Sequence, residues 1–395
     1  MSWIPYELGT DAMTRYFSTN RPVWGLLYQV TTRILPHVPV YWQIFALLLR
    51  ALTGILFFAV VKRIWKGRDS FALIAAFIFL LYPGFNQQWG SYLYSHFFIV
   101  LNFFLASLYF TLRALDEPNR FRLHTFLALL FSALNLWMME YFFFLELIRP
   151  FIIFFALRDR ESYTGTHVHT YTGKHSSFIL HLSSLSLPYI LVWIADLIFR
   201  FTIFNNTVYS TSLIGLLKED FFGGLAHTIQ MILASFWTVT GPALAQVFQL
   251  PNPSADGLRV TLMVAGVIIL VFVVTQYVVR SRQVDTYTGK PSSFIFHLSS
   301  LSLLALFFAG WPFWLIDFPP ALGHPTSRFT LPFMFGVSLL VAGLLELIPW
   351  SRWKYLLAGL LIALCAGRQA FWSNDYRLEW NRQTELFWQK TWRAP

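Results

Sequence analysis

The stretch VYWQIFALLLRALTGILFFAVV, residues 40–61, contains one charged side chain, Arg50, among its 22 residues. A run of this length and apolarity is long enough to cross the hydrocarbon core of a bilayer as a single helix. Four basic residues follow it closely: Lys62, Arg63, Lys66 and Arg68. Since basic residues accumulate in cytoplasmic loops, the stretch predicts a membrane-spanning helix whose C-terminal end faces the cytoplasm.

The whole chain has the composition of an integral membrane protein. Of its 395 residues, 56% are hydrophobic and only 12% are charged, whereas soluble domains average about 25% charged residues. The net charge of +10 comes from short basic clusters between apolar runs, a pattern typical of cytoplasmic loops, so we expect no nucleic-acid partner. The single cysteine, Cys365, excludes a disulfide or a cysteine-based metal site within one chain.

Similar apolar runs recur along the chain, each of about 17 to 25 residues. They lie at 40–61, 70–86, 92–112, 123–139, 141–157, 178–200, 259–279, 294–316, 330–349 and 354–370. The sequence therefore predicts an all-α fold, a polytopic transmembrane helix bundle of about ten spans. The apolar segment 226–248 is predicted to be re-entrant or to lie on the membrane surface, because one more span would reverse the basic bias of the later loops.

The predicted topology divides the chain into three parts. Residues 1–39 form an outward-facing acidic loop and a juxtamembrane helix, residues 40–370 form the bundle with an outer loop at 201–257, and residues 371–395 form an outward tail rich in tryptophan. The expected location is the cytoplasmic (inner) membrane, in which the protein is multi-pass. An outward N-terminus without a preceding span is hard to translocate, so we expect a first helix to be missing by truncation.

One segment occurs twice with only two differences. TYTGKHSSFILHLSSLSL at 170–187 returns at 286–303 as TYTGKPSSFIFHLSSLSL. Because the flanking sequences do not align, we interpret the copies as inserted repetitive segments in two cytoplasmic loops, at 163–187 and 284–303. The alternative is a metal site, but no carboxylate or cysteine partner stands at ligand spacing from the nearby histidines: His167, His169, His175 and His181. We therefore predict no metal ligands there.

The polar segment before the first span is the first candidate site. Pro5 can open a helix, and Glu7, Asp11 and Arg15 then recur every four residues on one helix face. Such a face is either a solvated helix with weak ion pairs or a functional acidic site. Pro22 is predicted to start a second helix, which lies against the membrane rather than crossing it.

The outward ends of two predicted spans carry further candidates. In YPGFNQQWGSYLYSH, residues 82–96, the polar and aromatic side chains are of the kind that hold sugars: Asn86, Gln87, Gln88, Trp89 and His96. Equally well, Trp89 with Tyr92 and Tyr94 suits an aromatic belt at the membrane interface, and His96 suits a hydrogen bond inside the bundle. In WLIDFPPALGHPTSRF, residues 314–329, Arg328 lies in an outer loop against the usual charge bias and is suited to bind a lipid phosphate.

Charged residues also lie within or beside the predicted spans. In MMEYFFFLELIRP, Glu146 and Arg149 are three residues apart and are predicted to pair with each other. Asp196 and Arg200, four residues apart, offer a similar pairing at the outward end of their span. Glu140 has no such local partner, and this makes it the more interesting candidate for a site.

An acidic outer loop, a surface helix and many aromatic-rich spans together resemble the GT-C glycosyltransferases. That superfamily includes protein O-mannosyltransferases and lipid A aminoarabinose transferases. The local resemblance lies in YELGTDAMTRYFSTNRPVWGLLYQ, residues 6–29, where Asp11 best fits the acidic position of the first external loop and Glu7 is the second choice. Two departures are clear: the first helix of the superfamily is absent, and His96 stands where such enzymes often carry another acid near the outer end of the third or fourth helix.

The resemblance implies a transferase that moves a sugar from a polyprenyl-phosphate lipid to an acceptor hydroxyl on a glycan, lipid or protein at the outer face. Asp11, or Glu7 as second choice, is then the catalytic acid or base. The implied substrate-binding residues are Arg15, Tyr16, Arg21, Asn86, Gln87, Gln88, Trp89, His96, Glu140, Arg200 and Arg328. The arginines among them are suited to the leaving phosphate. The lipid-linked sugar is the expected donor, and a divalent metal is left open.

Two other functions stay open at this level. A multi-span transporter or lipid-linked glycan flippase would use intramembrane charges such as Arg50, Glu146 and Asp196 along a path, and would show inverted halves, which we do not find in the sequence. A non-catalytic relative of the GT-C enzymes is the third hypothesis. No convincing nucleotide-binding motif is present.

Overall fold

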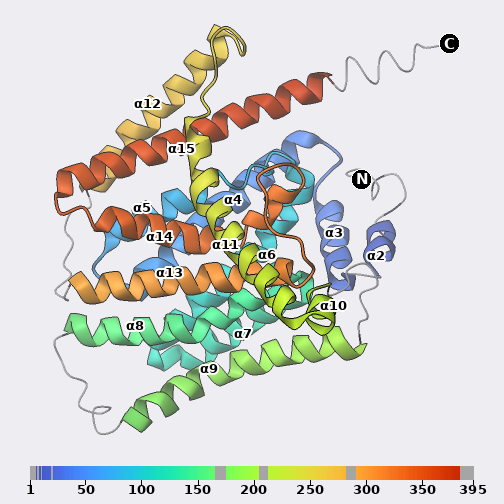
Figure 1. The fold of residues 1–395 in the computed structure, drawn as a ribbon, viewed down its shortest axis with the longest axis vertical. Coiled ribbons are helices and arrows are strands. Elements are labelled where there is room, and N and C mark those ends of the chain that lie inside the picture. Colours follow the sequence, from blue (N-terminus) through green and yellow to red (C-terminus); the bar gives the residue numbers. More distant parts are fainter. Residues whose placement is uncertain are drawn as a thin grey trace.

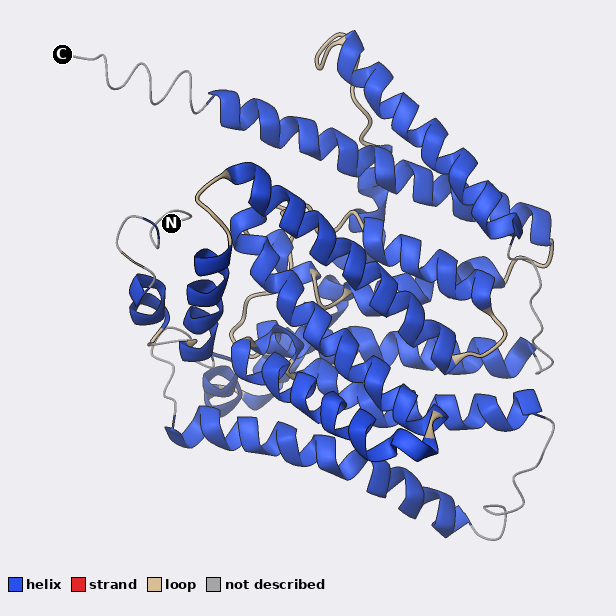
Figure 2. Ribbon diagram, turned by 180° about the vertical axis from the view of Figure 1, so that it is seen from behind, coloured by secondary structure: helices blue, strands red, loops and turns tan. Residues whose placement is uncertain are grey.

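The computed structural model of the protein describes residues 6, 9, 11–18, 21–164, 175–203, 212–281 and 291–382. Over these residues the fold is all-helical, without a strand (Figure 1, Figure 2). The α-helices, in chain order, are α2 (Asp11–Phe17), α3 (Pro22–Ile34), α4 (Pro39–Ile64), α5 (Asp69–Leu81), α6 (Ser91–Asp116), α7 (Phe121–Met138), α8 (Arg149–Thr164), α9 (His175–Ile198), α10 (Ser212–Glu219), α11 (Phe221–Ala245), α12 (Leu258–Ser281), α13 (Pro291–Trp314), α14 (Met334–Glu346) and α15 (Ser351–Arg382).

Eight stretches of helix are long and apolar enough to cross a membrane. Seven coincide with predicted spans and lie at Pro39–Ile64, Ser91–Asp116, Pro118–Met138, Leu180–Ile198, Leu258–Val279, Ser293–Trp314 and Ser351–Arg382. The eighth, Phe221–Phe248, contains α11. The prediction of an all-α, multi-pass membrane protein is therefore confirmed, whereas the described residues do not form ten long spans.

Two of the predicted spans are short helices. α5 and α14 have 13 residues each, which makes about 20 Å of helix, less than the roughly 30 Å of the hydrocarbon core. Proline accounts for both, because it lacks the backbone N–H and restricts the residue before it. Pro83 follows α5 closely and Pro332 precedes α14. The apolar runs 70–86 and 330–349 are thus longer than their helices.

A third predicted span, 141–157, is interrupted. The chain makes two short 3-10 turns, Glu140–Phe142 and Phe144–Ile148, before α8 begins at Arg149. Pro150 occupies the first turn of α8, where a missing N–H costs no hydrogen bond. The helix therefore starts near this proline, and Glu140 is left in an irregular connection at the end of α7.

By length α11 qualifies as a span, yet its contacts lie along the ends of other helices. His227 Nε2 lies 2.8 Å from Asp317 Oδ1, Trp314 Nε1 donates to Ser235 Oγ at 3.0 Å, and Tyr82 donates to the carbonyl of Val239 at 2.6 Å. Figure 1 shows α11 running obliquely across α13. The position predicted for 226–248, re-entrant or on the membrane surface, stays a prediction, because the helix is long and apolar enough to cross a membrane.

We call the end of the bundle that carries α2, α3 and α10 the outward end, following the predicted topology (Figure 1). The opposite end, where α4 finishes with Lys62 and Arg63, is called the cytoplasmic end. α6 forms the centre between them: 67% of its most apolar stretch is buried, against 17% for α12. It packs between α4 and α7, and Thr53 of α4 donates to Asn102 of α6 at 2.8 Å, a polar contact of the kind that joins membrane helices.

The N-terminal residues differ from the predicted single helix. Gly9 has a φ of 90°, outside the helical region, and α2 begins only at Asp11. Because a left-handed glycine ends a helix rather than continuing it, α2 does not extend back through Gly9. Asp11 and Arg15 lie four residues apart on α2, as predicted, and Glu7 lies outside the described residues. The helix start at Pro22 is confirmed.

The described part of each sequence copy is helical. It begins at the sixth residue of the copy, His175 in α9 and Pro291 in α13, because the first five residues of each copy lie outside the described residues. Leu180 and the equivalent Phe296 are both 69% exposed, whereas Leu298 is 1% exposed and the equivalent Leu182 is only partly buried. The two copies thus keep the same exposed position and differ in how far their inner side is covered.

Candidate functional site at the outward end

Asp11 lies on a small helical unit formed by α2 and α3. Its carboxylate accepts a hydrogen bond from the side-chain amide of Gln29 on α3. The two helices approach closely at Gly25, where a Cβ atom would lie 2.7 Å from Thr14 Cα. A glycine is therefore required at this crossing, and Asp11 is held exposed above the later turns of α3.

Arg21, just before α3, fastens this unit to the bundle. Its Nε donates to Glu140 Oε2 at 2.9 Å and its Nη2 donates to Glu140 Oε1, so that the pair is bidentate. The guanidinium also lies 6.0 Å from the ring centroid of Tyr141. Glu140 thus has no partner nearby in the sequence, as predicted; its partner stands 119 residues earlier in the chain.

The environment of Glu140 decides its protonation state. Burial raises the pKa of the carboxyl, but the charge and hydrogen bonds of Arg21, with the charge of Arg200, outweigh burial and lower the pKa to about 2. Glu140 is therefore a carboxylate at neutral pH and a poor proton acceptor. Its geometry suits it to orient Arg21 rather than to act as a base.

Arg200 brings a second acidic residue to this cluster. Its Nε donates to Asp196 Oδ2 at 2.7 Å, which confirms the pairing expected from their spacing. Its Nη2 donates to the carbonyl of Leu136 at 2.6 Å, at the end of α7. Asp196 Oδ1 is buried and has no hydrogen-bond partner among the described residues. The cluster of Arg21, Glu140, Arg200 and Asp196 thus gathers four charged groups at the outward end.

The three amides after Tyr82 link distant segments. Ser327 accepts a hydrogen bond from Gln87 Nε2 at 2.6 Å and donates to Asn86 Oδ1 at 2.7 Å. Gln88 donates to the side chain of Gln369 on α15. Gln87 is fully buried. Asn86 and Gln87, predicted as substrate-binding, are therefore positioned to hold the outer loops together.

Gln88 and Trp89 line a cavity of about 310 Å³ beside α4. Arg50 lines it too, donates through Nε to the carbonyl of Leu80 at 2.9 Å, and lies 5.3 Å from the ring centroid of Phe98. The remaining lining is mostly aliphatic. The cavity combines an apolar wall, three carboxamides and one arginine, which is a suitable environment for an amphipathic anion.

His96 is buried rather than open to a ligand. Its Nδ1–H donates to the carbonyl of Tyr92 at 2.8 Å, its Nε2 lies 2.8 Å from Thr31 Oγ1, and its ring stacks on Tyr28 with centroids 3.6 Å apart. Since a carbonyl only accepts, the proton of the neutral ring is on Nδ1. His96 thus positions α3 on α6, and no substrate contact is open to it in this arrangement.

Arg15 and Tyr16 keep exposed positions, whereas Arg328 is partly buried. Arg15 is exposed on α2 and half of Tyr16 is exposed beside it. The guanidinium of Arg328 lies 5.1 Å from the ring centroid of Phe329, and among the described residues it has no carboxylate partner. These cations are suited to meet an anionic group from outside the chain.

The structure does not bring Asp11 to Glu140. Asp11 contacts Gln29 in the later half of α3, whereas Glu140 contacts Arg21, which precedes the first turn of α3. The described residues contain no group of three histidine, cysteine, aspartate or glutamate side chains able to hold a metal ion. The predicted residues therefore form separate groups around the outward end rather than one constellation.

Sequence reasoning missed the partners that organise this end of the molecule. Gln87 bonds Ser327 and Gln88 bonds Gln369, both far away in the sequence. Only the partner of Asp11, Gln29, stands nearby in the sequence. A serine or glutamine in an apolar run was the one available signal, because a buried polar side chain needs a hydrogen-bond partner.

No protein-family model, no curated protein and no solved structure matches this chain.

Proposed function

We propose that this protein is a glycosyltransferase of the cytoplasmic membrane that moves a sugar from a polyprenyl-phosphate lipid to an acceptor hydroxyl at the outer face. The observation that carries the proposal is the α2–α3 unit, which holds Asp11 exposed while Arg21 fastens the unit to Glu140. An exposed carboxylate on a fixed outward helix is the minimum that a hydroxyl-activating enzyme of this kind needs.

The proposed step balances with the chain's own groups. The acceptor oxygen forms a bond to the anomeric carbon, and the bond between that carbon and the phosphate oxygen breaks with its electron pair on the phosphate. Asp11 accepts the hydroxyl proton. Arg328, which has no carboxylate partner among the described residues, stabilises the charge on the leaving phosphate.

The cavity beside α4 that Gln88 and Trp89 line supports a lipid donor. Its lining is apolar on the side of α4, where Leu47 is 60% exposed at the surface of the bundle. Arg50 and Gln88 add polar groups to the same cavity. A prenyl chain with a phosphate needs this combination, since its tail prefers apolar surface and its head prefers hydrogen-bond donors.

The test is a transfer assay in membranes with radiolabelled polyprenyl-phosphate hexoses and pentoses. We expect label to move into lipid, glycan or protein with the wild type, and Asp11→Asn to reduce the rate by about 10²- to 10⁴-fold, the usual contribution of a general base. The matched control is Glu219→Gln, another exposed carboxylate on the outward helix α10, which should leave the rate unchanged.

Two results would overturn the proposal. The first is the absence of transfer from any donor by protein that elutes as a single folded species in gel filtration. The second is equal transfer by Asp11→Asn and the wild type. In the latter case Arg328→Gln separates a role in phosphate binding, seen as weaker donor binding, from no role at all.

A transporter or flippase is the second candidate, because Glu146 and Arg149 are charged and almost completely buried within the bundle. Arg149 donates to Thr111 at 2.6 Å and to Ser107 at 2.9 Å and pairs with Glu146, which confirms the predicted pairing. Its hydrogen bonds join α6 to α8, a structural role that fits without a transport path. Movement of intact lipid-linked sugar across vesicles without transfer would favour this candidate.

A further inference from the structure

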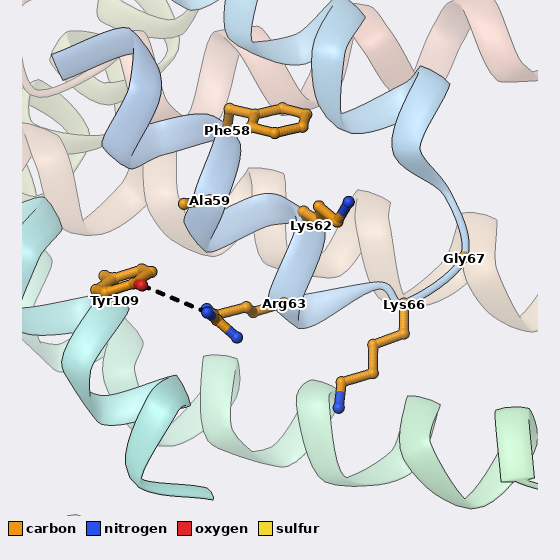
Figure 3. Close-up of a pocket in the computed structure, with 7 residues that line it drawn as sticks. All are labelled: Phe58, Ala59, Lys62, Arg63, Lys66, Gly67 and Tyr109. Carbon is orange, nitrogen blue, oxygen red and sulfur yellow. Dashed lines mark hydrogen bonds between the residues drawn. The ribbon is translucent and has the colours of Figure 1, made fainter. Parts of the chain in front are cut away.

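The cytoplasmic end of α4 carries a second cavity, of about 320 Å³, away from the outward groups. Figure 3 shows its lining: Lys62, Arg63 and Lys66 lie on one side, and Phe58, Ala59 and Tyr109 lie deeper along α4 and α6. We propose that this cavity binds the head group of an anionic phospholipid of the cytoplasmic leaflet. The inference does not depend on the proposed transferase activity.

The depth of the cavity matches the head-group region. α4 has 26 residues and is about 39 Å long, whereas the hydrocarbon core is about 30 Å thick. The last turn of α4, with Lys62 and Arg63, therefore reaches beyond the core. Phe58 and Ala59 lie one turn deeper, so the cavity is cationic at head-group depth and apolar toward the acyl chains.

The cations keep hydrogen-bonding capacity. Lys62 donates to Asp69 at 2.6 Å, and Lys66 donates to Asp116 at 2.7 Å. Each ammonium has three N–H groups, so two on each lysine are left for another acceptor. Arg63 donates to the same Asp116 at 2.8 Å. One carboxylate thus serves two cations.

The side chains are accessible as well as charged. The exposed fractions are 45% for Lys62, 29% for Arg63 and 37% for Lys66. Arg63 is oriented by Tyr109, whose hydroxyl lies 3.4 Å from its Nη2 and whose ring centroid lies 4.8 Å from the guanidinium carbon (Figure 3). An arginine held in this way loses little freedom when it binds a phosphodiester.

An anionic lipid fits the cavity better than a soluble anion does. A free phosphate needs only the cations, whereas a phospholipid also covers the exposed parts of Phe58 and Ala59 with its first methylene groups. Basic pockets between helices on the cytoplasmic side are the sites where lipid head groups are held in membrane proteins. The order of polar and apolar groups therefore favours the lipid.

The test measures lipid binding to the full chain in detergent by native mass spectrometry. The probes are dioleoylphosphatidylglycerol, dioleoylphosphatidylcholine with the same acyl chains, and inorganic phosphate as competitor. We expect the wild type to prefer phosphatidylglycerol, and the double variant Lys62→Gln with Lys66→Gln to bind it about 25-fold more weakly, since each basic residue near a membrane contributes roughly fivefold.

The matched control removes two other cations from the same end. Arg120 and Arg122 are exposed and lie outside the cavity, so Arg120→Gln with Arg122→Gln should keep the wild-type affinity. The single variant Lys62→Gln, whose side chain is the most exposed of the three, should lose about fivefold and serves if the double variant does not fold.

Three outcomes would overturn the inference: equal binding of the two lipids, equal loss in the control double variant, or full displacement of phosphatidylglycerol by millimolar phosphate. The last result would assign the cavity to a soluble anion. Retention of phosphatidylglycerol preference by the lysine variants, in protein shown to be folded by gel filtration, would also contradict it.

Discussion

The outward and cytoplasmic ends of the bundle use the same residue types in different ways. At the outward end Arg21 and Glu140 form a bidentate pair with side chains 14% and 29% exposed, and the pair connects segments 119 residues apart. At the cytoplasmic end Lys62 pairs with Asp69 only seven residues away, with 45% and 29% exposed. The Arg21–Glu140 pair is thus more enclosed than the Lys62–Asp69 pair and joins distant segments, whereas Lys62 is exposed and its pair is local.

The difference shows how burial separates structure from recognition. A partly buried pair is expensive to break because the remaining partner stays without compensation, so it fixes the position of α2 and α3. An exposed pair adds little to stability and leaves its donors available. The charged groups that organise the outward end are therefore poor candidates for ligand binding. Better candidates are Asp11, which is exposed, and Arg328, which has no carboxylate partner among the described residues.

The largest effect should follow from Glu140→Gln. The substitution leaves Arg21 without its counter-charge, and we expect the α2–α3 unit to lose about 2 to 3 kcal/mol of docking free energy, somewhat less than for a fully buried pair. Hydrogen exchange of α2 and α3 in detergent should rise while that of α6 does not. The control is Glu379→Gln, which removes an exposed pair with Arg382 and should change neither. Unchanged exchange of α3 in Glu140→Gln would contradict the comparison.

The same pair should respond to acid. The pKa of Glu140 is about 2 in the folded protein, below the value of about 4.3 for an unperturbed glutamate. The pair's stabilisation is therefore complete above about pH 4.3 and is lost as the pH falls toward 2. Spin labels on the exposed positions Leu26 of α3 and Phe126 of α7 would report this by their distance distribution.

Broadening of that distribution should occur only below about pH 4.3 in the wild type. Glu140→Gln should show the broad distribution at every pH, because it lacks the titrating group. A transition in the wild type near neutral pH would mean that another group controls the docking of α3.

A smaller effect is expected from Ser327→Ala. This change removes the hydroxyl that accepts from Gln87 and donates to Asn86, and it leaves a buried amide without its partner. The expected loss is about 1 to 3 kcal/mol of unfolding free energy. Thr326→Ala, whose hydroxyl bonds only a nearby carbonyl, is the control and should lie within about 0.5 kcal/mol of the wild type. Equal values for the two variants would show that the outer amides do not hold these loops together.

The smallest effect is expected from Lys62→Gln at the cytoplasmic end. Its pair with Asp69 is half-exposed, so the unfolding free energy should change by less than about 0.5 kcal/mol. Denaturant unfolding in detergent without anionic lipid measures this. A loss as large as that of Ser327→Ala would erase the contrast between the two ends.

Long apolar runs were sufficient to predict most of the helices. The stretch 40–61 became α4, because nothing within it interrupts helical hydrogen bonding. The single span predicted at 141–157 is wrong, because hydropathy does not report backbone geometry. The chain makes two short 3-10 turns before Pro150. The surface or re-entrant position predicted for 226–248 rests on the charge bias of distant loops, whereas its length and apolarity make it a candidate span.

Local pairs were predictable and distant pairs were not. Glu146 with Arg149 and Asp196 with Arg200 follow from helical spacing. The partner of Glu140, Arg21, could not be predicted from helical spacing. Arg21 reaches the turn Glu140–Phe142 only in the folded bundle.

The place of His96 after Tyr94 suggested a substrate contact, yet the rings of Trp24 and Tyr28 on α3 cover it. Sequence spacing does not show which side chains cover a residue in the folded protein.

The duplicated segment shows how far neighbouring helices, rather than the sequence itself, decide burial. In both copies the described residues are helical, and the equivalent Leu180 and Phe296 are both 69% exposed. Leu298 of α13 is 1% exposed, whereas the equivalent Leu182 of α9 is partly buried. α13 packs against α14 and α9 against α7. One sequence can therefore serve in two surroundings, with its exposed side kept and its inner side covered to the extent that the neighbouring helix allows.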